Sequence, residues 1–103
     1  IVKKAIAYIE QNYEKKLSLQ EVADYCYDSQ WHLSKLINKY AGKSYYDLLN
    51  SVRIEKAKEL LADPSLKIGD IVDLVGYSDS GHFSRTFKKL TGLSANEYRS
   101  RLS

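Results

Sequence analysis

Two stretches of the sequence place small, polar and cationic side chains at spacings of three, four and seven residues, so that each set would share one face of a helix. The sets are Trp31, Ser34, Lys35 and Asn38 in the first stretch, and Gly81, Ser84, Arg85 and Lys88 in the second. Small side chains let a helix approach base edges in the major groove of DNA, where Lys or Arg reaches guanine acceptors. Further along, Lys39 and Lys89 are placed to meet a phosphate and to add affinity that does not depend on base sequence. These residue types therefore indicate recognition of double-stranded DNA.

The two stretches are copies of one pattern. The segment HLSKLINKYAG at 32–42 recurs as HFSRTFKKLTG at 82–92, and the apolar residues of 19–26 recur at 68–75 with a shift that is one residue smaller. The difference falls in a turn, where an extra residue is tolerated. Each copy reads as a helix, a tight turn and a second helix, which is the helix-turn-helix unit. Because neither 29–46 nor 80–96 contains an acidic residue, the second helix is the basic part of each unit.

Helical periodicity and a single proline predict an all-α chain of about seven helices. The expected helices are about 2–13, a short one after Ser18, about 30–41, one from Ser44 to about 62, and about 68–75, 80–90 and 95–102. Ser18, Ser44 and Ser94 are the expected N-caps. We expect one domain over 1–103, made of two helix-turn-helix subdomains at about 1–43 and 66–103 that are joined by a long central helix at about 44–62.

The face opposite each polar stripe is apolar and is expected to pack in the core. The inner stripes are Leu33, Leu36, Ile37 and Tyr40 in the first copy, and Phe83, Thr86, Phe87 and Leu90 in the second. Tyr13, Tyr40 and Tyr98 fall on apolar stripes, so we expect packing to explain them. The first turn has no glycine, unlike the second with Gly76, so Tyr27 or Asp28 is expected to take any strained backbone conformation there.

Residues that could bind metal or act as a nucleophile are few. His32 and His82 occupy matching positions and have no further His or Cys at ligand spacing, so a structural role is favoured over a metal site. Cys26 aligns with Val75 and is expected to fill the core. Neither a carboxylate pair nor a nucleophile–base set nor a glycine-rich phosphate loop stands at suitable spacing, so an enzyme is the weakest interpretation, and no cofactor is expected.

Size and composition agree with a small intracellular binding domain. The chain has 103 residues, a net charge of +3 and one cysteine, and no apolar run approaches the ~20 residues of a membrane span. A reducing, cytoplasmic setting fits best. Since the chain lacks methionine altogether, we expect it to be part of a longer protein. One alternative stays open, a helical protein-interaction module whose basic faces bind an acidic partner.

The sequence resembles the double helix-turn-helix DNA-binding domain of the AraC/XylS transcription regulators over essentially its whole length. The stretches that carry the resemblance are LSLQEVADYC, SQWHLSKLINKYAGKSYYDLL, VRIEKAKELL and KIGDIVDLVGYSDSGHFSRTFKKLTGLSANEYR. The opening KKAIAYIEQNYEKKLSL is similar to output domains of YesN-type two-component response regulators. The resemblance implies transcriptional control in the bacterial cytoplasm, contact with RNA polymerase, and a receiver or sensor domain elsewhere in the polypeptide.

The resemblance also implies positions for DNA contacts. Base-reading positions fall on Gln30, Trp31, Ser34 and Lys35 in the first unit and on Ser80, Gly81, Ser84 and Arg85 in the second. Backbone-contacting positions fall on Asn38, Lys39, Lys88 and Lys89. The sequence departs from the family where Ala95 replaces the usual proline of the last helix, and where Ile37-Asn38 replaces Phe-Lys, which removes one basic contact.

The expected central helix bears on how many grooves one chain covers. At ~1.5 Å per residue it is ~27 Å long, and successive major-groove segments on one face of DNA are ~34 Å apart. We therefore expect one chain to reach two adjacent groove segments, with slight bending of the DNA.

Overall fold

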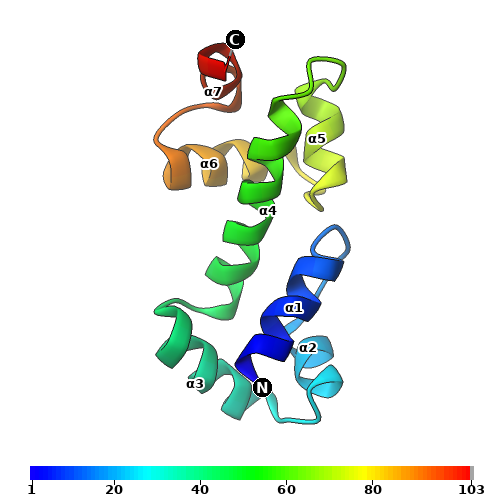
Figure 1. Ribbon diagram of the computed structural model, residues 1–103, viewed down its shortest axis with the longest axis vertical. Helices are drawn as coiled ribbons and strands as arrows, with labels where there is room; N and C mark the ends of the chain where they lie inside the picture. Colours follow the sequence, from blue (N-terminus) through cyan, green and yellow to red (C-terminus); the bar gives the residue numbers. More distant parts are fainter. Residues whose placement is uncertain (103) are drawn as a thin grey trace. The chain divides into compact units, whose positions relative to one another are not determined.

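The computed structural model describes residues 1–102, which form seven α-helices and no strand (Figure 1). The helices are α1 (Val2–Asn12), α2 (Leu19–Tyr25), α3 (Gln30–Ala41), α4 (Tyr45–Leu61), α5 (Ile68–Leu74), α6 (Ser80–Thr91) and α7 (Ala95–Leu102). The all-α prediction is confirmed. Where a residue number was predicted for a helix end, the observed end lies within one residue of it. None of these helices is long and apolar enough to cross a bilayer.

Side-chain caps explain why the helices begin where they do. The hydroxyl oxygens of four serines accept a backbone N–H three residues later, at 3.1–3.2 Å, at the starts of α2, α3, α4 and α7: Ser18, Ser29, Ser44 and Ser94. At α7 the cap is reciprocal, because Glu97 Oε1 accepts the Ser94 N–H at 2.9 Å. Gly42 and Gly92 end α3 and α6 in the left-handed conformation.

The chain divides into two compact units, and the division falls inside α4. The first unit is Ile1–Val52 and contains α1, α2, α3 and the first half of α4. Its core is built from the apolar faces of all four segments: Ala5, Ile9, Val22, Ala23, Cys26, Leu33, Ile37 and Leu49. The expectation that Cys26 fills the core is confirmed.

The second unit begins at Arg53 and contains the rest of α4 with α5, α6 and α7. Aromatic rings dominate its buried interior. Phe83 lies 5.7 Å from Phe87 between ring centroids, and Phe87 lies 5.6 Å from Tyr98 in an edge-on contact. Since Phe83 and Phe87 are both fully buried, they fix the inward face of α6 and leave its other face exposed.

The turns of the two helix-turn-helix units each contain a residue with a positive φ, but the residue types differ. Gly76 has a φ of 98° in the second turn, and Tyr27 has a φ of 56° at the corresponding place in the first. Left-handed backbone is unfavourable for a side chain with a Cβ, so the prediction of strain in the first turn is confirmed at Tyr27. Its ring is 93% exposed, with the Lys4 ammonium 5.4 Å from the ring centroid.

Two residues of the predicted inner stripes are exposed. Tyr40 is 67% exposed and Leu90 is 48% exposed, so the expectation that packing explains Tyr40, and that Leu90 belongs to the core, was wrong. Both lie in the last turn of their helices, and the packed part of each stripe ends one turn earlier, at Ile37 and Phe87. Tyr13 and Tyr98 are half-buried, as expected.

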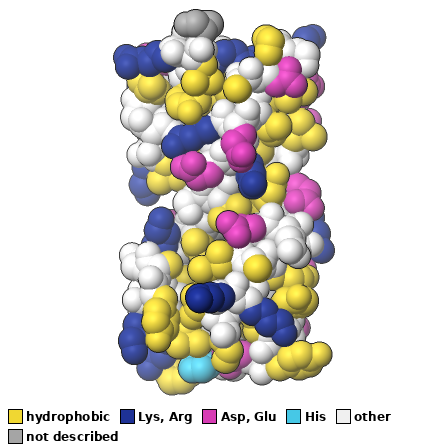
Figure 2. All heavy atoms as spheres, in the orientation of Figure 1, with side chains coloured by type: hydrophobic (Ala, Val, Ile, Leu, Met, Phe, Trp, Pro, Cys, Tyr) yellow, Lys and Arg dark blue, Asp and Glu magenta, His cyan; other side chains and the backbone are white. Residues whose placement is uncertain are grey.

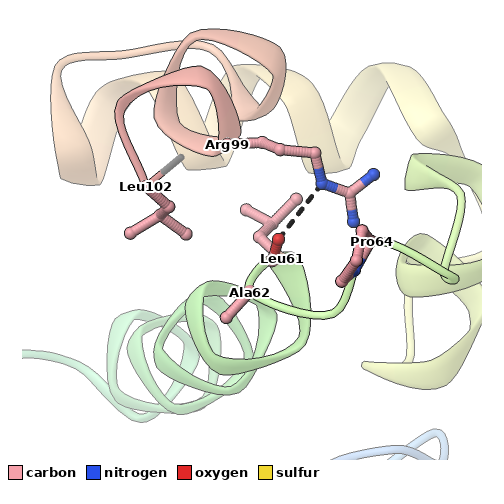
Figure 3. Close-up of a pocket in the computed structure, with 5 residues that line it drawn as sticks. All are labelled: Leu61, Ala62, Pro64, Arg99 and Leu102. Carbon is pink, nitrogen blue, oxygen red and sulfur yellow. Dashed lines mark hydrogen bonds between the residues drawn. The ribbon is translucent and has the colours of Figure 1, made fainter.

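Within the second unit, α7 closes the end of α4 (Figure 3). Arg99 Nε donates a hydrogen bond to the Leu61 carbonyl oxygen at 3.1 Å, and its Nη2 donates to the Asp63 carbonyl oxygen at 3.2 Å. The Leu61 carbonyl is one that the end of α4 leaves without an intrahelical partner. The Asp63 carbonyl lies beyond the helix and also accepts the Leu66 N–H at 3.2 Å. Beside the guanidinium, Leu61, Ala62, Pro64 and Leu102 line a small open hollow.

Candidate nucleic-acid interface

In the first unit, α3 presents one buried face and one exposed face. Leu33 and Ile37 are fully buried, which holds the helix against α1 and α2. The opposite side carries the residues predicted to contact DNA. Five of these are exposed and one is half-buried: Gln30, Trp31, Lys35, Asn38 and Lys39, with Ser34 half-buried.

Trp31 is the most unusual of these residues because its side chain is 69% exposed. The ammonium of Lys35, one helical turn later, lies 4.1 Å from the centroid of the indole ring. This is a cation–π contact, and it fixes a flat apolar surface and a positive charge side by side near the start of α3. A surface of this kind can meet a thymine methyl group or a sugar while the charge reaches a polar base edge.

The remaining polar residues of α3 are partly engaged within the unit. The Gln30 amide nitrogen donates to the Gln20 side-chain oxygen, and Asn38 Nδ2 donates to the Ser34 carbonyl oxygen at 3.0 Å. Gln30 and Ser34 also line an open depression whose walls include Ser44 at the start of α4. Asn38 is thus directed at its own helix, and a contact with DNA would require it to turn outward.

In the second unit, α6 repeats the arrangement. Phe83 and Phe87 are buried, and the predicted contact residues lie on the other side: Ser80, Ser84, Arg85, Lys88 and Lys89 are exposed, with Gly81 half-buried. The helix is capped by Asp79, whose Oδ1 accepts the Gly81 N–H at 2.8 Å.

Gly81 leaves room that Arg85 uses. A β-carbon on Gly81 would lie 3.2 Å from Arg85 Nη1 and 3.2 Å from Asp79 Oδ1. The guanidinium of Arg85 therefore folds back over the start of α6, beside the capping carboxylate. Asp79 was not among the residues predicted from the sequence to lie in this interface. The signal that could have found it is an acidic residue at the N-cap, two positions before a glycine and six before an arginine.

Lys88 is the one predicted contact residue that approaches an acidic side chain among the ion pairs found in residues 1–102. Its Nζ lies 3.9 Å from Glu97 Oε1, and both side chains are mostly exposed. The pKa of Glu97 is lowered, chiefly because its carboxylate accepts the Ser94 backbone N–H and also because of the Ser94 hydroxyl and Lys88. At this distance and exposure the pair is weak, so Lys88 can leave it for a phosphate.

The two histidines contact neighbouring side chains of their own units. His32 Nδ1 lies 2.7 Å from Asp28 Oδ2, and this hydrogen bond is the main reason that the pKa of Asp28 is lowered. The His82 ring packs edge-on against Tyr77 at 5.1 Å between centroids, and burial raises the pKa of Tyr77. Within residues 1–102 no group of three or more His, Cys, Asp or Glu side chains is placed to hold a metal ion.

On the face that Figure 2 presents, lysine and arginine side chains are interspersed with hydrophobic ones rather than merged into one basic area. This agrees with the modest net charge of +3. Any DNA contact would therefore depend on where individual cations stand on α3 and α6 more than on the overall charge.

Known proteins show the same architecture. The model of a helix-turn-helix domain family matches residues 22–101. The bifunctional transcriptional activator and DNA repair enzyme AdaA of Bacillus subtilis is 34% identical over 92 residues, which are 89% of this chain and 44% of that protein. The chain spans less than half the length of the first curated relatives it matches.

Two solved structures are similar over nearly the whole chain. The C-terminal domain of AraT, a response regulator from Geobacillus stearothermophilus, is 39% identical with a TM-score of 0.90, and the match covers 97% of this chain and 84% of that one. The C-terminal domain of the two-component response regulator YesN from Fusobacterium nucleatum is 31% identical with a TM-score of 0.85, covering 94% and 95%.

Proposed function

Because the chain belongs to the AraC-type helix-turn-helix family, the DNA-binding domains of transcriptional regulators, we propose that α3 and α6 are its two recognition helices and that each reads a segment of major groove. The observation that carries this proposal is the duplicated exposed face. In each unit two buried apolar residues hold the helix, and a small or polar residue with a cation one position later faces outward, as Ser34 with Lys35 and Ser84 with Arg85.

The two faces offer different contacts. In the first unit, Trp31 supplies an apolar surface and Lys35 a single positive charge. In the second, Ser84 permits close approach and Arg85 can bind the two guanine acceptors together. The polar residues Gln30 and Ser80, at the first position of each helix, complete the base-reading set, and Lys39, Lys88 and Lys89 contact phosphates. Asn38 joins the phosphate set once it turns away from the Ser34 carbonyl.

A single chain covers two adjacent groove segments in this proposal. With 17 residues, α4 is ~26 Å long at ~1.5 Å per residue, which is shorter than the ~34 Å between successive groove segments on one face of DNA. A modest bend of the DNA toward the protein closes the difference.

The role of the whole protein follows from the same premise. The relatives named above are regulators in which this domain is one part, so we propose that a receiver or sensor domain accompanies it, that RNA polymerase is a further partner, and that it acts in the bacterial cytoplasm where the genome lies. The repair activity in the name of AdaA is not transferred, since the chain spans 44% of that protein. The proposed role is binding rather than catalysis.

Selection of bound duplexes from a random pool tests the proposal. Lys35→Ala and Arg85→Ala should each relax the base preference, at two positions about 10 bp apart. Lys56→Ala, which removes a lysine of α4 that pairs with Glu59 at 3.5 Å, is the control and should leave both preferences in place. If the Lys35 and Arg85 variants lower affinity equally for every sequence, the two residues contact phosphate only and the base-reading assignment is wrong.

The alternative is a protein-interaction module that binds an acidic partner through the same basic faces. Both modes weaken as salt rises, but only DNA reading also favours the selected duplex over a scrambled competitor. Equal affinity for the two duplexes at every salt concentration would favour the alternative.

A further inference from the structure

We propose that Asp79 is a positioning residue for Arg85: its carboxylate holds the guanidinium over Gly81, at the start of α6, in the place from which it reads a guanine. This inference rests on the proposed function of α6 and adds a residue that sets the selectivity of the second unit. Capping alone would give Asp79 a purely structural role. A positioning role depends on where its carboxylate lies relative to the Arg85 guanidinium.

The side chains of Asp79 and Arg85 approach each other over Gly81, which has no β-carbon. Arg85 Nη1 and Asp79 Oδ1 both lie 3.2 Å from the point where a β-carbon on Gly81 would stand, so the two atoms are no further apart than twice that distance. They are also more than 4.0 Å apart, because none of the ion pairs found in residues 1–102 joins Asp79 and Arg85. The attraction is therefore that of two exposed opposite charges that lie near each other without direct contact. With a larger residue at position 81, the guanidinium could not lie across the helix start in this way.

The first unit supports the same interpretation by contrast. At the repeat shift of 50, Ser29, Trp31 and Lys35 occupy the places of Asp79, Gly81 and Arg85. There the cap is neutral, and the cation lies on the indole ring at 4.1 Å. The cation at the same helical position therefore has a different neighbour in each unit, an aromatic ring in contact with it in one and a carboxylate near it in the other.

The carboxylate also changes what Arg85 can bind. A negative charge beside the guanidinium repels phosphate, which opposes sequence-independent binding at this point. It leaves the bidentate match to a guanine edge in place, because that contact uses the planar fork of donors rather than the net charge alone. Asp79 should therefore lower affinity for DNA in general and raise the preference for guanine.

The test compares Asp79→Asn with Asp70→Asn. Asparagine keeps a side-chain oxygen that can cap α6 but removes the charge. Asp70 is the matched control, because its Oδ2 accepts the Lys67 N–H at 3.0 Å at the start of α5 in the same unit, so the same substitution makes the same change in net charge. Dissociation constants are measured for the selected duplex, for a duplex changed at the base pair that Arg85→Ala relaxes, and for a scrambled duplex.

We expect Asp79→Asn to strengthen binding to the scrambled duplex and to reduce the preference for the selected base pair by up to about fivefold, since an exposed ion pair in direct contact sets the upper limit. Asp70→Asn should leave that preference unchanged. Gly81→Ala should reduce the same preference, because the new β-carbon would lie 3.2 Å from both Arg85 Nη1 and Asp79 Oδ1 and would displace the two groups from each other.

Each remaining outcome is decisive. If Asp79→Asn changes the three affinities in the same proportions as Asp70→Asn, Asp79 is a cap and the positioning role is refuted. If binding to all duplexes falls together with the thermal midpoint, a structural role explains the result and the proposal is also refuted. If the unmodified chain binds the selected and the scrambled duplex with equal affinity, the proposed function is refuted instead.

Discussion

At the scale of single residues, Trp31 separates function from folding most clearly. Its side chain is 69% exposed, and the only charge placed on its ring by the contacts of residues 1–102 is the Lys35 ammonium. A large aromatic side chain on the surface does little for the core. Such exposure is what the proposed contact with DNA requires of Trp31.

We expect Trp31→Ala to leave the free energy of unfolding within about 0.5 kcal/mol of the original, as is usual for surface substitutions. Binding to the selected duplex should weaken by about 1 kcal/mol or more, the typical effect of one altered base contact. Urea unfolding and fluorescence anisotropy measure the two quantities. Tyr40→Ala is the control, since Tyr40 lies at the other end of α3 with a similar exposure of 67%. Equal losses of DNA affinity in the two variants would contradict a specific role for Trp31.

Residue-level expectations from the sequence succeeded where helical spacing decides the outcome. Phe83 and Phe87 are buried and Ser84 and Arg85 are exposed, as the periodicity predicts. The prediction from spacing was wrong at Leu90. The apolar stripe continues to the end of α6, but no other described segment of the unit buries Leu90 in the last turn of the helix. Spacing also missed Asp79, because its proposed effect on Arg85 depends on how the arginine side chain lies over Gly81. Helical spacing does not predict side-chain conformation.

At the scale of elements, the helix bounds were predictable because capping residues in the sequence mark many of the helix ends. Serine caps begin four of them, and glycines in the left-handed conformation end α3 and α6. The end of α4 is different. Asp63-Pro64 follows the last turn of α4 and prevents the helix from continuing. The residue that satisfies the Leu61 carbonyl, Arg99, comes from α7 and could not be assigned from local pattern.

Arg99→Met tests how much this closure contributes. The variant keeps an apolar stem but loses the donors to the Leu61 and Asp63 carbonyls, and we expect a loss of about 1–3 kcal/mol in the free energy of unfolding. Hydrogen exchange should show the loss of protection in the second unit, around the end of α4 and in α7. Arg101→Met, an exposed neighbour in α7, should have little effect. Equal destabilisation by both variants would mean that general charge in α7, not the cap, is responsible.

At the scale of the whole molecule, three carboxyl groups tie stability to pH. The pKa values of Asp28, Asp63 and Glu97 are all lowered in the folded chain, mainly by hydrogen bonds from His32, Ser65 and the Ser94 backbone respectively. A folded pKa below the unfolded one adds stability that is complete above the unfolded value. That stability is lost as the pH falls through the folded value.

We therefore expect the thermal midpoint to fall as the pH is lowered from about 5 toward 2, below the ordinary carboxyl range. Asp28→Asn, Asp63→Asn and Glu97→Gln together should flatten this dependence and lower the midpoint at neutral pH. Glu10→Gln, Glu14→Gln and Asp73→Asn together, at three exposed positions, are the charge-matched control. Calorimetry across the pH range measures both, and an unchanged acid slope in the triple variant would contradict the assignment.

The different neighbours of the two cations have an evolutionary consequence. A lysine that lies on an aromatic ring tolerates many neighbouring residues. An arginine that lies over a glycine and near a carboxylate does not, so substitutions at Asp79, Gly81 and Arg85 must occur together. If α3 and α6 read DNA as proposed, mutations that retarget such a regulator should therefore accumulate faster along α3, while α6 preserves an inherited half of the operator. Comparing operators across close descendants would show one half drifting and the other nearly fixed.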